Sequence, residues 1–473
     1  MLEGLEISEI RYSEVLKHTL SSRFDSEFFK KIYLKDDKAI AKNGFNKLVK
    51  VTNKINVGFV GAMVKHYRDE GITILQTKNI DAFFITDSDT IKITPHFHNE
   101  LKKSKIHKKD ILIARSGSFG KASIYLDDEV INSSDIIIVE ANELLINPYF
   151  LVSFLNSKFG INQMIRFASG GLQGHVNLTI LEELEVPKIN NVFQLEIERL
   201  LELAYSQKQQ SKEAYKQAEN ILLKDIGLQC FTPNTEPINI KNLKDSFAIS
   251  GRLDAEYYQL KYEDIENKIL NNTNGFTIIA NEFEHIYLKS KKEKIGFNYI
   301  EIGDVNVSDG SCNSNYVLTK ELPANAKTLV KKGDILISKV RPYRGAVTLI
   351  NFEKEDLIVS GAFTVLREKE TSIFSNEVLK VLLRTKEYKE LLLKFNVGTS
   401  YPVIKDIDVL KLPIPKISKK VQEDVTLKIQ LSSKLKQQSK HLLEVAKIAV
   451  EIAIEENEDV AIEYIKNQSI KNG

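Results

Sequence analysis

Cysteine is scarce in this sequence, and no segment resembles a secretion signal or a membrane span. Only Cys230 and Cys312 occur among 473 residues, too few for a disulfide framework or a four-cysteine zinc site. No apolar run approaches the ~18 residues that a membrane span needs. The N-terminal residues include Glu3 and Glu6, unlike the basic and then apolar layout of a secretory signal. We therefore expect a cytoplasmic protein with no membrane partner.

A strong excess of charge of either sign is also missing. The 66 Lys and Arg residues are balanced by 64 Asp and Glu residues, so the whole chain has no general attraction for nucleic acid. Any DNA-binding field must therefore be local. A length of 473 residues exceeds the usual size of one hydrophobic core, and two or more domains are expected.

Catalytic motifs are absent as well. There is no phosphate loop ending in Gly-Lys-Ser/Thr and no His-Glu-x-x-His motif, and the eight histidines show no metal-ligand spacing. The segment Asn147-Pro148-Tyr149-Phe150 is similar to the Asn/Asp-Pro-Pro-Tyr/Phe element of adenine methyltransferases but lacks the second proline. We interpret Asn147 as a helix cap, with Pro148 in the first turn. We expect no catalytic residue, no metal site and no cofactor in this chain.

What the sequence does contain is one internal repeat. Asp110 and Asp334 lie in matching segments 224 positions apart, and Asp25 and Asp254 lie in matching segments 229 positions apart. Several matches occur in the same order, and the separation between matching segments changes little along the chain, which indicates two homologous halves. The matching pairs are 22–29 with 251–258, 109–115 with 333–339, 186–189 with 414–417, and 208–212 with 436–440. One departure is Lys109, which stands where the second half has Gly333, so we expect the turn there to differ.

Each half begins with short β-type runs broken by glycine and asparagine turns, and ends in a long helix. We predict strands at 110–114, 136–139, 334–338 and 362–366. In the first helix, a stripe from Ile197 to Leu222 recurs at spacings of three and four and is apolar except for Lys208 and Ser211, and Gly227 follows as a stop. In the second, residues from Leu431 to Ile452 follow a seven-residue period.

Such a helix could simply pack on its own half of the chain, but the duplication favours two helices that pair with each other. We therefore predict an α+β fold with two homologous mixed α/β domains, separated by two long helices that form an antiparallel coiled coil. The predicted boundaries are 1–190 for the first domain, 191–228 for the first spacer helix, 229–417 for the second domain and 418–473 for the second spacer helix.

This organisation resembles the specificity subunits of type I restriction-modification enzymes. The resemblance rests on the strand segments 109–115 and 333–339, the terminal strands at 184–189 and 410–417, and Arg-Leu-Asp-Ala-Glu-Tyr-Tyr at 252–258. It implies that each domain is a target-recognition domain for one half of a split DNA site. A helix of ~30 residues would be ~45 Å long, about one turn of DNA or slightly more. The implied partners are double-stranded DNA, two adenine methyltransferase subunits that use S-adenosylmethionine, and restriction or translocase subunits that use ATP and Mg²⁺.

DNA readers need cations for phosphates and forked donors or amides for base edges, and we expect these in two loops of each domain. One loop follows the repeated strand, and the other precedes the last strand. The candidates in the first domain are Arg115, Ser116, Ser118, Lys121, Gln173 and His175. The candidates in the second domain are Lys339, Arg341, Tyr343, Arg344, Ser400 and Tyr401.

Three other functions stay open at this point. The same architecture could serve a related methylation or phage-defence complex that lacks the type I motor. A duplicated coiled-coil scaffold that binds only protein would agree with the near-neutral charge, and it predicts no salt-sensitive DNA binding. An unrecognised enzyme is the third alternative, and the missing catalytic set weighs against it.

Overall fold

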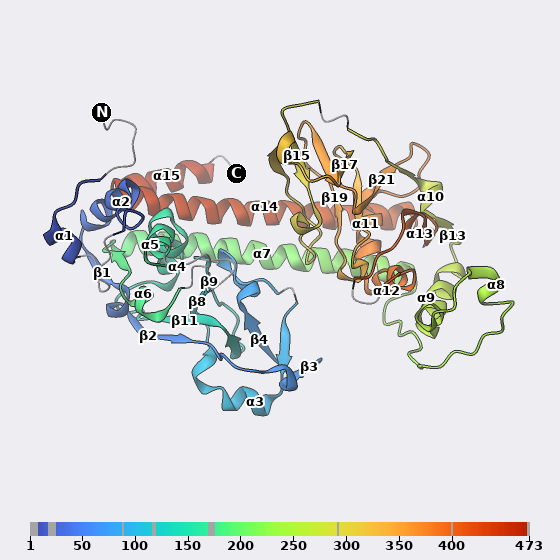
Figure 1. The fold of residues 1–473 in the computed structure, drawn as a ribbon, viewed down its shortest axis with the longest axis horizontal. Coiled ribbons are helices and arrows are strands. Elements are labelled where there is room, and N and C mark those ends of the chain that lie inside the picture. Colours follow the sequence, from blue (N-terminus) through green and yellow to red (C-terminus); the bar gives the residue numbers. More distant parts are fainter. Residues whose placement is uncertain are drawn as a thin grey trace. The chain divides into compact units, whose positions relative to one another are not determined.

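The computed structural model describes residues 8–17, 25–87, 89–115, 120–168, 176–290, 293–398 and 401–470. The chain divides into two compact units (Figure 1). Unit 1 comprises Met1–Gln209 and Lys436–Gly473, and unit 2 comprises Gln210–Leu435. Each unit includes part of both long helices, α7 (Asn191–Asp225) and α14 (Lys419–Glu455). We call the mixed α/β part of unit 1 module 1 (residues 25–190) and that of unit 2 module 2 (residues 251–417).

Unit 1 is built on two five-stranded sheets, with strand orders β2-β11-β8-β9-β5 and β3-β6-β4-β10-β7, and on the pair β1-β12. Its strands are β1 (Phe45–Lys47), β2 (Thr52–Val57), β3 (Tyr67–Arg68), β4 (Ile72–Gln76), β5 (Phe83–Phe84), β6 (Ile91–Ile93), β7 (Lys105–Ile106), β8 (Ile111–Ala114), β9 (Ala122–Ile124), β10 (Ile131–Ser134), β11 (Ile136–Ala141) and β12 (Glu185–Pro187). Its shorter helices are α1 (Tyr12–Lys17), α2 (Lys31–Ala41), α3 (Pro95–Glu100), α4 (Pro148–Asn156), α5 (Lys158–Ala168), α6 (Leu178–Glu182) and α15 (Glu458–Ile470).

Unit 2 repeats this plan with two four-stranded sheets, β14-β21-β18-β19 and β16-β15-β20-β17, and the pair β13-β22. Its strands are β13 (Phe276–Ile278), β14 (Phe283–His285), β15 (Gly296–Ile300), β16 (Asn315–Leu318), β17 (Ala326–Leu329), β18 (Ile335–Ser338), β19 (Val347–Leu349), β20 (Leu357–Ser360), β21 (Phe363–Glu368) and β22 (Pro413–Pro415). Its shorter helices are α8 (Phe247–Ser250), α9 (Leu260–Leu270), α10 (Ile279–Glu282), α11 (Asn376–Arg384), α12 (Lys386–Lys394) and α13 (Asp406–Leu410).

The repeated strand is apolar throughout because it is buried on both faces. In β8, Ile111 and Ile113 join the main core of unit 1, whereas Leu112 and Ala114 join a second cluster. In β18, Ile335 and Ile337 lie in the main core of unit 2, and Leu336 lies in another cluster. Since successive side chains of a strand point to opposite faces, this strand contributes side chains to two hydrophobic clusters in each module. The predicted strands at 110–114 and 334–338 are confirmed to within one residue.

The turn before this strand is the same in the two modules, so the expected difference at Lys109 is wrong. Lys109 and Gly333 both have a positive φ, 71° and 93°. The amide of Lys109 donates to the carbonyl of Tyr125 (2.6 Å), and the amide of Gly333 donates to that of Ile350 (2.8 Å). The backbone contacts of the turn therefore hold Lys109 in a conformation that glycine adopts more easily.

The segments of α7 and α14 run antiparallel within each unit. In unit 1, Ser439 Oγ donates to the carbonyl of Ala204 at 2.6 Å, and residues nearer the start of α7 share a core with residues nearer the end of α14. In unit 2, Ser211 Oγ donates to the carbonyl of Ser432 (2.7 Å), and Lys428 Nζ donates to Gln217 (2.8 Å). These findings confirm the α+β fold class, with two similar mixed modules and paired long helices. The helix segments also belong to the cores of the modules. Their apolar faces therefore pack both on the modules and on the other long helix.

The expected single helix over 418–473 is wrong near its end. Helix α14 stops at Glu455, and a separate helix, α15, starts at Glu458. Asn457 lies between them, and its side chain accepts a hydrogen bond from the amide of Val460 (3.0 Å), which caps the new helix. Lys42 Nζ donates to the carbonyl of Glu456 (2.9 Å) at the same break. The rest of the four-part division by residue ranges stays a prediction.

Helix α4 begins as its sequence predicts. The side chain of Asn147 accepts from the amides of Tyr149 (2.8 Å) and Phe150 (3.4 Å), and Pro148 is the first helical residue. The helix-cap interpretation of this segment is confirmed. Ser375 caps α11 at the equivalent place in module 2.

Two properties of the whole described chain complete this picture. No helix in these ranges is both long enough and apolar enough to cross a membrane. Within the same ranges, no cluster of three or more His, Cys, Asp or Glu side chains is arranged to hold a metal ion.

Candidate nucleic-acid interface

Two loops of module 2 that the sequence singled out lie against each other. One follows β18 and contains Val340 and Arg341, and the other contains Pro402 and Val403. Val340 and Val403 form an isolated antiparallel bridge, and the amide of Arg341 donates to the carbonyl of Pro402 at 2.8 Å. Backbone hydrogen bonds therefore fix the two loops as one surface.

Arg341 occupies a strained position on this surface. Its φ of 48° is left-handed, a conformation that costs a residue other than glycine of the order of 1 kcal/mol or more and that persists where the surroundings impose it. Its guanidinium lies 5.2 Å from the ring centroid of Tyr401, a cation–π arrangement. A 3₁₀ turn follows at Pro342–Arg344. The strained backbone thus places the Arg341 guanidinium, a forked hydrogen-bond donor, over the exposed ring of Tyr401.

Both tyrosines of the two loops and Arg344 are open to solvent. Tyr401 is 57% exposed and Tyr343 is 42% exposed, and Arg344 is exposed too. Among the described residues, neither Arg341 nor Arg344 has a carboxylate partner. Their charges are therefore available for an anionic ligand such as a phosphate backbone.

Lys339, also predicted to contact DNA, is engaged inside the protein. Its Nζ lies 3.0 Å from an oxygen of Asp406, and its side chain is only 18% exposed. The same carboxylate accepts a hydrogen bond from Thr364 Oγ1 at 2.6 Å. Lys339 therefore joins the two loops to the sheet, and Arg341 and Arg344 supply the open positive charge.

Module 1 has one matching backbone hydrogen bond at the equivalent place. The amide of Val176 donates to the carbonyl of Arg115 (3.3 Å), just as the amide of Ile404 donates to the carbonyl of Lys339 (3.0 Å). Arg115 also pairs with Asp135 at 2.8 Å, and Lys121 pairs with Asp81 at 2.7 Å. Both predicted cations of module 1 thus have acidic partners. The other predicted residues, Ser116, Ser118, Gln173, His175 and Ser400, lie outside the described residues.

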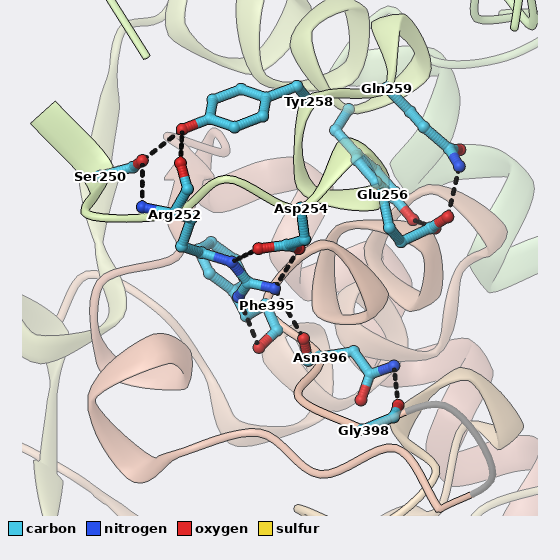
Figure 2. A network of polar contacts seen from close by, with 10 residues as sticks. Ser250, Arg252, Asp254, Glu256, Tyr258, Gln259, Phe395, Asn396 and Gly398 are labelled. Atoms are coloured by element: carbon cyan, nitrogen blue, oxygen red, sulfur yellow. Dashed lines mark hydrogen bonds and ion pairs between the residues drawn. The ribbon is translucent and has the colours of Figure 1, made fainter. Parts of the chain in front are cut away.

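The repeated Arg-x-Asp motif braces one of the module 2 loops (Figure 2). Arg252 forms a two-point ion pair with Asp254, in which Nε donates to the carboxylate at 2.8 Å. Its other nitrogens donate to the carbonyls of Phe395 (3.3 Å) and Asn396 (2.8 Å). The side-chain nitrogen Nδ2 of Asn396 in turn donates to the carbonyl of Gly398 at 3.0 Å. Arg252 therefore fixes the chain just before the loop that carries Tyr401.

The charge of this brace is stable at neutral pH. The hydrogen bonds from Arg252 lower the pKa of the Asp254 carboxyl below its usual value, and the same contacts raise the pKa of Arg252. Each partner thus favours the ionised form of the other. The sequence marked this motif only as the opening of a repeat, and the identity of the braced loop, more than 140 positions away, could not be read from it.

Comparison with known proteins gives a family for module 1. Residues 30–197 match the family model described as the type I restriction modification DNA specificity domain. Over 149 residues, the chain is 32% identical to the type I restriction enzyme HindI specificity subunit of Haemophilus influenzae. That alignment covers 29% of this chain and 32% of the relative, so it spans about a third of the relative's length. The resemblance noted in the sequence is thereby confirmed for residues 30–197.

Two solved structures are similar in fold at low overall scores. They are the type I restriction-modification S subunit from M. genitalium (TM-score 0.40, 14% identity, 87% of this chain and 94% of that one) and the HsdS subunit from Thermoanaerobacter tengcongensis (TM-score 0.28, 14% identity, 87% and 96%).

Proposed function

We propose that this chain, in which residues 30–197 match the type I restriction modification DNA specificity domain, reads a two-part DNA target and catalyses no reaction itself. Outside the matched residues, the proposal is carried by the pair of loops in module 2, where Arg341 lies over the exposed ring of Tyr401. An arginine fork and an aromatic face at a fixed backbone are suited to base edges and sugars. In module 1 the flanking residues Arg115 and Val176 share the matching backbone hydrogen bond, so each module would read one half-site.

The function requires partners that supply the chemistry. We propose double-stranded DNA, two adenine methyltransferase subunits that bind S-adenosylmethionine, and restriction or translocase subunits that bind ATP and Mg²⁺. In this proposal the chain acts in the cytoplasm and binds none of these cofactors itself. The two copies of the module and the two long helices are consistent with two methyltransferase subunits, because a repeated surface offers the same contact twice.

The test is methylation mapping in cells. The full chain is expressed with its cognate adenine methyltransferase, and the methylated adenines are compared with those in cells that express the methyltransferase alone. A new motif with two specific halves and an unspecific gap is the expected result. If a complex between the two proteins forms and no new motif appears, the proposal is wrong and a protein-binding scaffold is favoured. Methylation without restriction of unmodified DNA would favour the related complex that lacks the motor.

A further inference from the structure

The carboxylate of Asp406 connects the module 2 loops with a strand that the sequence did not mark as functional. Besides Lys339 and Thr364, it faces His285, whose Nε2 lies 3.7 Å from a carboxylate oxygen. His285 is the last residue of β14, and Thr364 is on the neighbouring strand β21. The end of β14 therefore lies at the same carboxylate as the loop that leads to Arg341.

Beyond His285 the chain stays extended and presents an aromatic residue and a lysine. The amide of Ile286 donates to the carbonyl of Val365 (2.9 Å), and the carbonyl of Leu288 accepts from the amide of Leu329 (2.9 Å). Lys289 forms an isolated antiparallel β-bridge with Thr328. Because alternate side chains of an extended segment share a face, His285, Tyr287 and Lys289 form one row. The ring centroids of His285 and Tyr287 are 6.4 Å apart, and Lys289 Nζ lies 5.4 Å from the Tyr287 ring.

Tyr287 and Lys289 of this row are exposed, and Lys289 carries positive charge. Tyr287 is 57% exposed, so its ring does not serve the core of the module. Lys327 on β17 is also exposed, and its carbonyl accepts from the amide of Ser290 next to Lys289 (3.2 Å). Among the described residues, Lys289 has no carboxylate partner. Interleaved aromatic and basic side chains at an exposed edge are typical of surfaces that contact nucleic acid.

The equivalent strand of module 1 lacks such a row. Strand β2 pairs with β11 as β14 pairs with β21, and it carries Ile55 and Val57, which pack against the core of unit 1. Two modules that read different half-sites need different side chains at equivalent positions. The contrast between the two strands therefore agrees with a contact that is specific to one half-site.

We propose that Tyr287 and Lys289 contact DNA at the half-site read by module 2, with Tyr287 against a base and Lys289 at a phosphate. The inference rests on the proposed function of the chain and extends its DNA surface from two loops to three segments. Tyr287 then contributes to sequence preference, whereas Lys289 contributes affinity that does not depend on sequence.

The experiment uses the full chain in complex with its cognate methyltransferase and duplex DNA carrying the motif found by methylation mapping. Tyr287→Ala is expected to weaken binding about tenfold and to relax preference at one or two positions of the second half-site. Lys289→Ala is expected to weaken binding to all sequences about equally, and to reduce the slope of log K against log salt by about one. The matched controls are Tyr316→Ala and Lys320→Ala. Both side chains are exposed in module 2, and Tyr316 is on β16, the edge strand opposite β17 in its sheet.

The outcomes separate the two proposals. If the unmodified complex recognises no sequence, the proposed function fails. If it recognises a two-part motif, and Tyr287→Ala and Lys289→Ala bind and methylate DNA as Tyr316→Ala and Lys320→Ala do, only the present inference is overturned. Loss confined to the second half-site, with the first half-site read as before, supports it. Because the side chain of Tyr287 is largely exposed, its truncation is not expected to unfold the module.

Discussion

Ser211 and Ser439 hold the same position in the two copies of the internal repeat, and each donates its hydroxyl to a carbonyl of the other long helix. Ser211 on α7 bonds to Ser432 on α14 (2.7 Å), and Ser439 on α14 bonds to Ala204 on α7 (2.6 Å). The acceptors are themselves 228 positions apart, as the donors are. The conserved spacing thus reproduces one interhelical hydrogen bond in each unit.

These two hydroxyls are expected to stabilise the helix pair by similar amounts. Both serines are buried, and a buried intramolecular hydrogen bond contributes about 1 kcal/mol to the free energy of unfolding. Ser211→Ala and Ser439→Ala are each expected to lower that free energy by about this amount in urea unfolding. Because the two bonds lie in different units, the double variant is expected to show the sum within about 0.5 kcal/mol. Ser433→Ala, a half-buried serine beside Ser432, is the control, and an equal loss there would contradict the assignment.

Arg252 is expected to act on DNA recognition through the loop that it braces. Arg252→Ala removes the hydrogen bonds to the carbonyls of Phe395 and Asn396, and the segment that leads to Tyr401 loses its fixed position. We expect about tenfold weaker binding to the second half-site and unchanged preference at the first half-site. Arg252→Lys keeps the charge but cannot make the forked contacts. Its affinity for the second half-site is expected to lie between that of the unsubstituted chain and that of Arg252→Ala.

A general loss of stability would give a different result for Arg252→Ala. Reading of both half-sites would then fall together with the midpoint of urea unfolding. Arg199→Ala is a suitable control, because Arg199 is exposed on α7 and pairs only with Glu196 among the described residues. If both arginine variants lowered DNA binding equally, the bracing role would be excluded.

Much of the fold could be predicted because it depends on local patterns. The strands around Asp110 and Asp334 are apolar runs bounded by turns, and Asn147 caps a helix by a local rule. The side of a long helix that is buried was harder to predict. Leu431 fits the seven-residue period but is 45% exposed, whereas Ala446 is fully buried. Since α14 packs both on α7 and on the modules, its buried face is wider than a coiled-coil seam.

Long-range polar contacts could not be predicted at all. Gln194 accepts from the amide of Asn147 (2.9 Å), and Gln422 accepts from that of Ser375 (2.9 Å), so each glutamine fixes the start of a short helix. These residues are 228 positions apart, and the repeat contains them, but nothing in a glutamine specifies a distant amide as its partner. The pairing of Lys339 with Asp406 is of the same kind. The residue types of the two candidate loops were enough to identify them from the sequence. Only the structure shows which of their cations pair with a carboxylate and which are open to solvent.

Lys109 offers a test of backbone strain, because it takes the same turn conformation as Gly333. Gly333 takes its positive φ freely, whereas Lys109 has a φ of 71°, so Lys109→Gly is expected to raise the free energy of unfolding by about 1 kcal/mol. The substitution also removes an exposed ion pair with Glu143, which contributes little. Lys109→Ala removes the same ion pair and keeps the strain, so it is the matched control. Equal stability of the two variants in urea unfolding would show that the turn is not strained.

Arg341 combines a strained backbone with a guanidinium that has no carboxylate partner in the part of the chain that the structure describes, and the two properties can be separated by substitution. Arg341→Ala removes the guanidinium and keeps a side chain at a φ of 48°. We expect it to weaken binding at the second half-site by ~1–3 kcal/mol if the fork reads a base. Arg341→Gly removes the same fork and relieves the strain, so it is expected to bind DNA as poorly while unfolding at a higher urea concentration. Arg344→Ala is the comparison for a phosphate contact, with weaker binding to all sequences alike. Unchanged affinity and unchanged sequence preference in Arg341→Ala would remove this residue from the site and leave its backbone conformation as a feature of the loop alone.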